Sequence, residues 1–155
     1  SETETVADME ALMEWLPNHI PVAEETVALV HGDYRLDNMI FHPTEPQIIG
    51  ILDWELSTLG DPLADLAYQL MAWQFPREGG ISGLAGLDRT ELGLPSDDDY
   101  IAAYCQRTGR SGIDDWPFYM AFCFFRIAAI LQGIKKRAQI GTASSAEADS
   151  RATMV

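Results

Sequence analysis

Apolar residues recur along this chain with two different spacings, one typical of helices and one typical of strands. Val6 to Leu16 carries apolar side chains every three or four residues, which predicts an amphipathic helix. Thr26 to Val30 is short, almost wholly apolar and rich in β-branched residues, which predicts a strand buried on both faces. Residues 39–42 and 47–52 flank the turn-forming segment Pro43 to Pro46, and together they predict a hairpin.

The second half of the chain carries helix start and stop signals. Gly60-Asp61-Pro62 begins a helix that should run to about Trp73, because aspartate is a good cap and proline is tolerated in the first turn. Ser96 and Asp99 form a capping-box pattern ahead of another helix, which should end near Gly109.

The longest apolar segment runs from Trp116 to about Ile140 and is apolar on more than one face, which predicts the central helix of a bundle. Between the helices, Phe75 to Pro95 is rich in glycine and has no periodicity, which predicts a long loop that is either mobile or part of a binding edge. No linker divides the chain. We therefore expect residues 1–155 to form a single α+β domain, mostly helical, with a small β-hairpin near its middle.

Composition and charge narrow the possible partners. The 155 residues are 47% hydrophobic, which is ample for a packed core, and 24 acidic against ten basic residues give a net charge of −14. Such a charge repels nucleic acid phosphates and anionic membranes, so we expect neither a nucleic acid nor a membrane partner. The two cysteines lack a CxxC spacing and suggest buried thiols, and the polar start does not resemble a signal peptide. These features predict a cytoplasmic protein.

Three oxygen-donor side chains stand in or beside the predicted hairpin. Phosphoryl transfer needs an oriented acceptor hydroxyl, a divalent metal and a pocket for the donor. Asp33, four further residues and Asn38 give the D-x-x-x-x-N spacing of kinase catalytic loops, where the aspartate accepts the hydroxyl proton and the asparagine binds magnesium. The hairpin should return Asp53 to the end where Asn38 lies, and Asp53 would be the carboxylate that holds the metal between the phosphates.

Three motifs in a fixed order resemble those of the aminoglycoside phosphotransferase and choline kinase-like family of small-molecule kinases. They are HGDYRLDN at 31–38, ILDWE at 51–55 and GDPLADLA at 60–67. The later stretches YCQRTGR and FCFFRIAAILQGI resemble the subgroup whose kinase domains occur beside acyl-CoA dehydrogenase-like domains. The resemblance implies a protein-kinase-like C-terminal lobe that uses ATP and Mg²⁺ to phosphorylate a hydroxyl group of a small molecule.

Carried over by motif, the resemblance implies that Asp33 is the catalytic base. Asn38 and Asp53 would then be the magnesium ligands. His31 would support the catalytic loop, and a purely structural, hydrogen-bonded histidine is the alternative reading of that position.

Five further positions are given supporting roles or remain open. Trp54 and Glu55 stand where protein kinases have the Phe and Gly of DFG. The conformational switching that depends on this Phe in protein kinases is therefore not expected here. Asp61 and Asp65 match a family pattern that braces the catalytic loop, although Asp61 is equally explained as a helix cap. Arg126, inside an apolar helix, either pairs with a carboxylate of the site or reaches solvent.

The sequence lacks the motifs that hold the phosphates of a nucleotide. Neither G-x-G-x-x-G nor G-x-x-x-x-G-K-[ST] occurs, and the only lysines, Lys135 and Lys136, lie late in a helix. We therefore expect the nucleotide-binding N-terminal lobe to be missing and the isolated chain to transfer phosphate weakly or not at all. That lobe or a second copy of the chain would be its protein partner.

Other functions remain open at this point. A pseudokinase-like binding module or inactive fragment would keep the fold without transferring phosphate. A metal-dependent phosphohydrolase is less well supported, because no set of several histidines and carboxylates could bridge metals. The acceptor is not defined, since the acidic residues at 97–99 and 114–115 suit either a polycation or the starts of helices.

Overall fold

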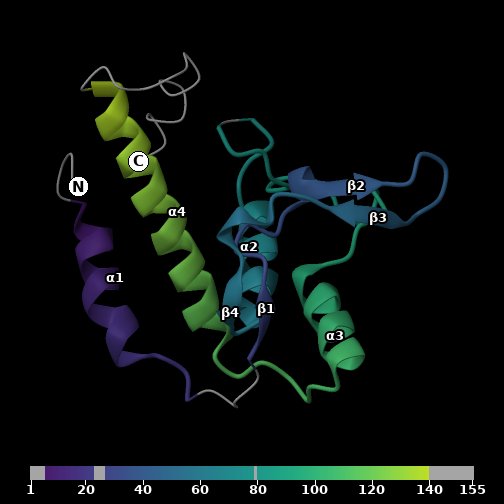
Figure 1. The fold of residues 1–155 in the computed structure, drawn as a ribbon, viewed down its shortest axis with the longest axis horizontal. Helices are drawn as coiled ribbons and strands as arrows, with labels where there is room; N and C mark the ends of the chain where they lie inside the picture. The colour runs from purple at the N-terminus through teal and green to yellow at the C-terminus, as the bar shows by residue number, and fades with distance from the viewer. Residues whose placement is uncertain (1–5, 23–26, 79, 140–155) are drawn as a thin grey trace.

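The computed structural model describes residues 6–22, 27–78 and 80–139, which form four α-helices and two small sheets (Figure 1). The helices are α1 (Ala7–Asn18), α2 (Leu63–Trp73), α3 (Asp97–Thr108) and α4 (Trp116–Gln139). The strands are β1 (Ala28–Val30), β2 (Met39–Phe41), β3 (Ile48–Ile51) and β4 (Thr58–Gly60), and the short 3₁₀ helices are η1 (Leu36–Asn38) and η2 (Trp54–Leu56). This mostly helical arrangement is the predicted α+β class.

The two sheets lie around the segment that carries the first two motifs. β2 and β3 pair as the predicted antiparallel hairpin, with Met39 opposite Ile51. β1 and β4 pair across a longer span of sequence, with Ala28 opposite Gly60. Because β1 precedes residues 31–38 and β4 follows η2, this second pairing brings together the two ends of the segment 31–57 (Figure 1).

The strand β1 is less buried than its composition predicts. Val30 is buried, but Leu29 is 61% exposed, and Leu59 on β4 is 73% exposed. A two-stranded sheet presents alternate side chains to opposite faces, and here only one face turns toward the rest of the protein. The prediction of a strand buried on both faces is therefore wrong.

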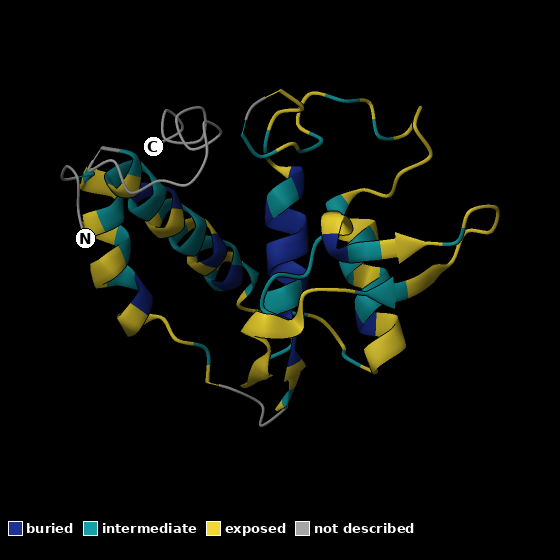
Figure 2. Ribbon diagram, turned by 45° about the horizontal axis from the view of Figure 1, so that its top comes forward, coloured by how far each residue is buried: buried dark blue, intermediate teal, exposed yellow. Residues whose placement is uncertain are grey.

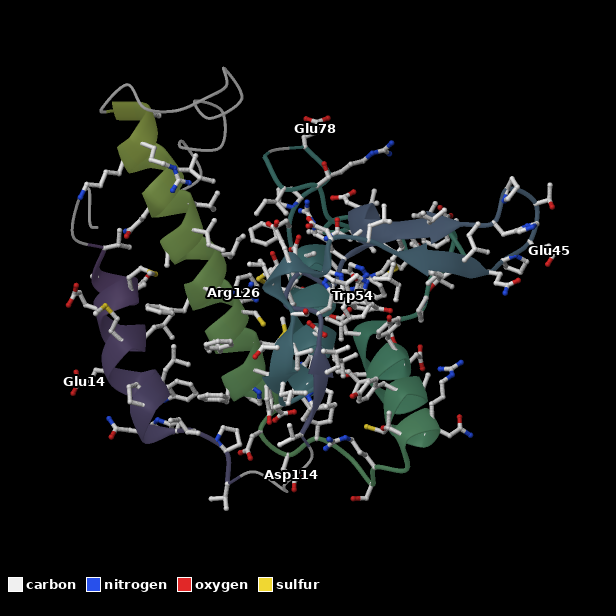
Figure 3. The ribbon with its side chains drawn as sticks, viewed as in Figure 1. Glu14, Glu45, Trp54, Glu78, Asp114 and Arg126 are labelled. Carbon is white, nitrogen blue, oxygen red and sulfur yellow. The ribbon has the colours of Figure 1, made fainter. Side chains whose placement is uncertain are left out.

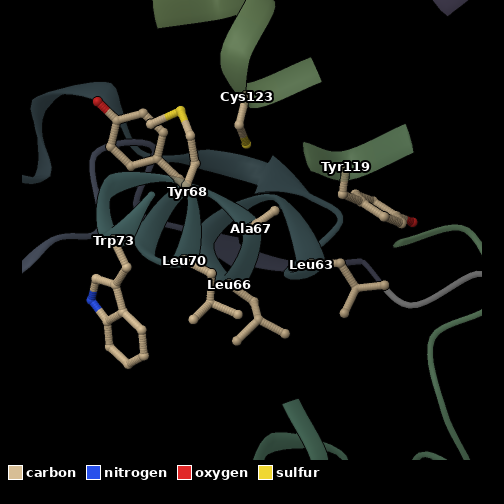
Figure 4. Packing of buried hydrophobic residues seen from close by; sticks show 9 residues of the cluster. Leu63, Leu66, Ala67, Tyr68, Leu70, Trp73, Tyr119 and Cys123 are labelled. Atoms are coloured by element: carbon tan, nitrogen blue, oxygen red, sulfur yellow. The ribbon is translucent and has the colours of Figure 1, made fainter. Parts of the chain in front are cut away.

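The hydrophobic core is centred on α2. Eight of its eleven residues are buried, and Ala67 and Leu70 are fully enclosed. Figure 2 shows this burial concentrated along α2, and Figure 4 shows Tyr119 and Cys123 of α4 packed against it. α4 lies between α1 and α2 and packs on both (Figure 1), but it is less buried than α2, with Phe122 39% exposed.

The apolar character of α4 has a second consequence. Among the helices that the structure describes, only α4, over Trp116–Ala138, is long and apolar enough to pass a length-and-hydropathy test for a membrane-spanning segment. Core helices of soluble proteins pass the same test, so the result assigns no membrane to the chain. The expectation that the protein has no membrane partner stays a prediction.

Three local predictions agree with the structure. The Ser96 hydroxyl accepts a hydrogen bond from the Asp99 N–H at 3.1 Å, so α3 begins with the expected capping interaction. The same helix ends at Gly109, which has a positive φ of 72° and suits glycine. Cys105 and Cys123 are free, buried thiols, as predicted.

Candidate active site

The catalytic loop, residues 31–38, packs directly against η2. Gly32 has a φ of +85°, and a Cβ atom at this position would lie 2.6 Å from the carbonyl oxygen of Leu56. Only glycine accommodates both the positive φ and this approach of two backbones. The loop that carries Asp33 is thereby held against the segment that follows Asp53.

Asp65, in the first turn of α2, accepts two backbone hydrogen bonds from the start of the catalytic loop. Its Oδ2 accepts the His31 N–H at 2.6 Å, and its Oδ1 accepts the Gly32 N–H at 2.9 Å. Asp61 makes different contacts: it accepts the N–H of Leu63 at 2.9 Å and the hydroxyl of Tyr119 at 2.6 Å. Asp65 therefore contacts the loop, whereas Asp61 caps α2 and ties it to α4.

His31 joins the catalytic loop to the end of the hairpin. It is only 2% exposed, its Nε2 lies 2.7 Å from the Leu52 carbonyl oxygen, and its Nδ1 lies 3.2 Å from the backbone nitrogen of Asp33. A carbonyl only accepts and a backbone N–H only donates, so these partners assign the ring proton to Nε2. Trp54 packs over the ring with centroids 4.7 Å apart. The histidine thus connects the segments that carry Asp33 and Asp53.

The Asp33 carboxylate is surrounded by hydrogen-bond donors and a cation. The Asn38 Nδ2 donates to its Oδ2 and to the Asp33 carbonyl oxygen, both at 2.9 Å. The Arg35 Nε lies 3.6 Å from the same Oδ2. Burial, the negative charge of Asp33 and a side-chain hydrogen bond with it raise the pKa of Tyr68 to about 12. Tyr68 is therefore protonated at neutral pH, and its hydroxyl donates to the carboxylate.

The hairpin brings the two proposed metal ligands to the same end, as the sequence predicts. The Leu52 N–H donates to the Asn38 carbonyl oxygen at 2.8 Å, so the chain next to Asp53 lies beside Asn38. Because the Asn38 amide nitrogen is engaged by Asp33, its Oδ1 is the atom left for a metal. Asp53 is exposed in a left-handed conformation with a φ of 64°.

The oxygen atoms of Asn38 and Asp53 suit a magnesium ion better than a metal ion whose ligands all come from the protein. No group of three or more histidine, cysteine or acidic side chains within the described residues could hold a metal ion. Mg²⁺ commonly takes one or two protein oxygens and completes its shell with phosphates and water, which Asn38 and Asp53 would allow. Glu55 is exposed in η2, and its side chain makes no hydrogen bond or ion pair with any residue that the structure describes.

A cavity of about 550 Å³ opens beside Asp33. One wall is the glycine-rich loop, as predicted for a binding edge: the Leu84 N–H donates to the Trp73 carbonyl oxygen at 3.0 Å, which docks the loop on the end of α2. The charged side chains that line the cavity are Asp33, Arg35, Asp37 and Arg126. Its aliphatic lining includes Ile81, Leu84, Ile127, Ile130, Leu131 and Ile134.

Sequence reasoning missed Tyr68 and left Arg126 open between two alternatives. Arg126 follows neither alternative: its Nη2 donates to the Gly32 carbonyl oxygen at 2.5 Å, and its guanidinium lies 5.1 Å from the centroid of the Tyr68 ring. Figure 3 shows Arg126 between α4 and α2. An arginine inside an apolar helix was a usable signal. Tyr68 gave no such signal, because a tyrosine in an apolar helix is usually core.

The sequence of the chain is similar to a protein family and to curated proteins. The family model described as "Phosphotransferase enzyme family" matches residues 1–122. Acyl-CoA dehydrogenase family member 10 of Mus musculus is 52% identical over 149 residues, which are 96% of this chain and 14% of that protein. Acyl-CoA dehydrogenase family member 11 of Homo sapiens is 39% identical over 138 residues, which are 88% of this chain and 18% of that protein.

A solved structure matches nearly the whole chain. It is a crystal structure from Ralstonia eutropha that carries the provisional name aminoglycoside phosphotransferase, and it matches with a TM-score of 0.91 and 52% identity. The match covers 98% of this chain and 46% of that chain. The present chain therefore spans less than half of this solved relative and less than a fifth of the two curated relatives.

Proposed function

The chain belongs to the phosphotransferase enzyme family, and we propose that its site transfers a phosphoryl group from ATP to a hydroxyl of a small molecule, with Mg²⁺. The observation that carries this proposal is the Asp33 carboxylate, which lines a cavity and accepts a hydrogen bond from the Asn38 amide at 2.9 Å. The kinase-like fold and the relatives confirm the resemblance that the motifs indicated.

In this proposal Asp33 is the general base. An acceptor hydroxyl in the cavity gives its proton to the carboxylate while its oxygen forms a bond to the terminal phosphorus of ATP, and the bond to the departing ADP breaks. Asn38 and Asp53 would hold Mg²⁺, which when bound neutralises charge on the phosphate oxygens. The hydrogen bond from the Asn38 amide keeps the Asp33 carboxylate oriented.

Arg35 supplies a positive charge at the place where the transferred group would lie. Its Nε is buried and has no hydrogen-bond partner among the described residues, although it lies 3.6 Å from the Asp33 Oδ2. A transferring phosphoryl group carries negative charge on its outer oxygens, and a fixed cation stabilises that charge. We therefore assign Arg35 an electrostatic role toward the phosphoryl group.

The cavity favours an acceptor with a largely apolar body. Much of its wall is aliphatic, and its two carboxylates, Asp33 and Asp37, are matched by two arginines. A polycationic amino sugar would find little net negative charge there. The acidic groups at 97–99 and 114–115 do not line the cavity, and Asp97 is instead paired with Arg89.

The donor nucleotide is proposed to be held mainly by a lobe outside these 155 residues. Support comes from the absence of a glycine-rich phosphate motif in the sequence and from the 46% coverage of the solved relative. Donor positioning supplies a large part of the rate in such reactions, so the isolated chain should be weakly active or inactive. On this proposal the chain is the catalytic lobe.

The test is transfer of labelled terminal phosphate from ATP to a panel of alcohols, with and without Mg²⁺. We expect weak transfer that requires Mg²⁺, disappears in Asp33→Asn and persists in Asp98→Asn, which alters an exposed carboxylate on α3 outside the cavity lining. Robust Asp33-dependent turnover would contradict the need for a separate donor lobe. Turnover that survives Asp33→Asn would contradict the role of the base, and a chain that neither binds Mg²⁺ nor transfers phosphate would support the binding-module alternative.

A further inference from the structure

We propose that Tyr68 and Arg126 are positioning residues that fix the Asp33 carboxylate toward the cavity. The inference rests on the proposed function, because it takes Asp33 to be the base. It assigns to α2 and α4 a part in the reaction that the three sequence motifs do not contain.

Tyr68 connects the Asp33 carboxylate to the hydrophobic core. The residue is 6% exposed and belongs to the core cluster on α2, so its ring has little freedom to move. A buried hydroxyl is costly unless it is hydrogen-bonded, and the bond with Asp33 supplies its partner. Asn38 also bonds Asp33 but belongs to the same loop, so it cannot fix the loop relative to the core.

Arg126 contacts both the backbone of the catalytic loop and the ring of Tyr68. Its Nη2 donates to the carbonyl oxygen of Gly32, the residue before Asp33, at 2.5 Å. Its guanidinium also lies over the Tyr68 ring, 5.1 Å from the centroid, which is a cation–π geometry. One side chain therefore restrains the loop backbone and the ring whose hydroxyl bonds the carboxylate.

The same arginine connects the base to the cavity wall. Ile127 and Ile130 follow Arg126 on α4, and all three residues line the cavity. An acceptor that packs against this wall would lie on the helix that holds the loop. Arg126 could alternatively bind an anionic group of the acceptor, and the two roles predict different results.

The first experiment follows Asp33 by NMR in the full chain, at neutral pH, through the ¹³Cγ resonance of its side chain. Tyr68→Phe keeps the ring and its stacking but removes the hydroxyl, so the Asp33 resonance and the amides of residues 31–38 should shift. Tyr119→Phe is the matched control, because it removes a tyrosine–carboxylate hydrogen bond of 2.6 Å to Asp61 instead. An Asp33 resonance that stays in place in Tyr68→Phe, or moves equally in both variants, overturns the proposal.

The second experiment separates positioning from acceptor binding by Arg126. Arg126→Lys keeps the charge but loses the planar group, so the amides of Gly32 and Asp33 should shift, whereas Arg107→Lys on the exposed side of α3 should leave them unchanged. Unchanged loop amides in Arg126→Lys would overturn its positioning role.

These readouts do not require turnover, so they stay separate from the test of the base by Asp33→Asn. Where transfer is measurable, Tyr68→Phe should lower kcat about tenfold, the kinetic equivalent of one hydrogen bond, with an unchanged KM for ATP.

Discussion

Replacing Gly32 with alanine should destabilise the protein by about 2–5 kcal/mol, the sum of a backbone cost and a steric cost. The backbone cost arises because Gly32 has a φ of +85°, where an L-residue loses about 1–2 kcal/mol. The steric cost arises because the new Cβ would lie 2.6 Å from the Leu56 carbonyl oxygen and 3.1 Å from the Leu56 Cβ. Relieving that overlap requires a backbone shift, at about 1–3 kcal/mol.

Gly86→Ala provides a matched control for the backbone cost. Gly86 has a φ of +80° but no atom within 4 Å of the position of an added Cβ, so its substitution should cost only about 1–2 kcal/mol. Urea unfolding measures both variants. With a denaturant dependence of about 2 kcal/mol per molar, Gly32→Ala should lower the unfolding midpoint by about 1–2.5 M and Gly86→Ala by about 0.5–1 M.

The two variants also differ in where the structure should change. Gly32→Ala should shift the NMR amide resonances of the catalytic loop and of η2, because these two backbones must separate. Gly86→Ala should leave both segments unchanged. Equal midpoints for the two variants, or an undisturbed loop in Gly32→Ala, would refute the close packing of the loop on Leu56.

Three further predictions concern the metal, the core and alkaline pH. Asp53→Ala should weaken Mg²⁺ binding in a titration while Glu55→Ala keeps it, and equal effects would contradict the assignment of Asp53. Leu70→Ala should cost about 2–5 kcal/mol because the side chain is fully buried, whereas Leu59→Ala, at 73% exposed, should cost under about 1 kcal/mol in the same urea assay. Burial above all raises the pKa of every one of the five tyrosines, that of Tyr68 to about 12. Because unfolded tyrosines ionise near pH 10, unfolding releases protons above that pH, so stability should fall as the pH rises from about 10 to about 12. A free energy of unfolding that is constant over this range would contradict the burial of these hydroxyls.

The features that the sequence predicted well depend on neighbouring residues. The hairpin and the approach of Asn38 to the segment before Asp53 follow from two apolar runs and a turn between them, within a span of about fifteen residues. The cap of α3 by Ser96 and its end at Gly109 are likewise set by local backbone chemistry. Short-range patterns of this kind specify their partners without reference to the rest of the fold.

The features that the sequence did not predict depend on how helices, strands and loops pack against one another. The prediction favoured α4 for its length and its apolar residues on more than one face, but α2 is the more deeply buried helix because it lies among α4, the catalytic loop and the glycine-rich loop. The exposure of Leu29 has the same origin, because a strand in a two-stranded sheet has only one covered face. The contacts of Tyr68 and Arg126 with the catalytic loop join distant segments, and no spacing rule connects them.

The hydrogen bond between Arg126 and Gly32 also constrains the order in which the site is assembled. Its two partners are 94 residues apart in sequence, so it is one of the longest-range contacts in the protein. Long-range contacts form only after the intervening chain has been organised, and during synthesis the N-terminal partner emerges first. A nascent chain that ends before α4 would hold all three sequence motifs but would lack this restraint on the catalytic loop. Completion of the site is therefore delayed until α4 docks on α2.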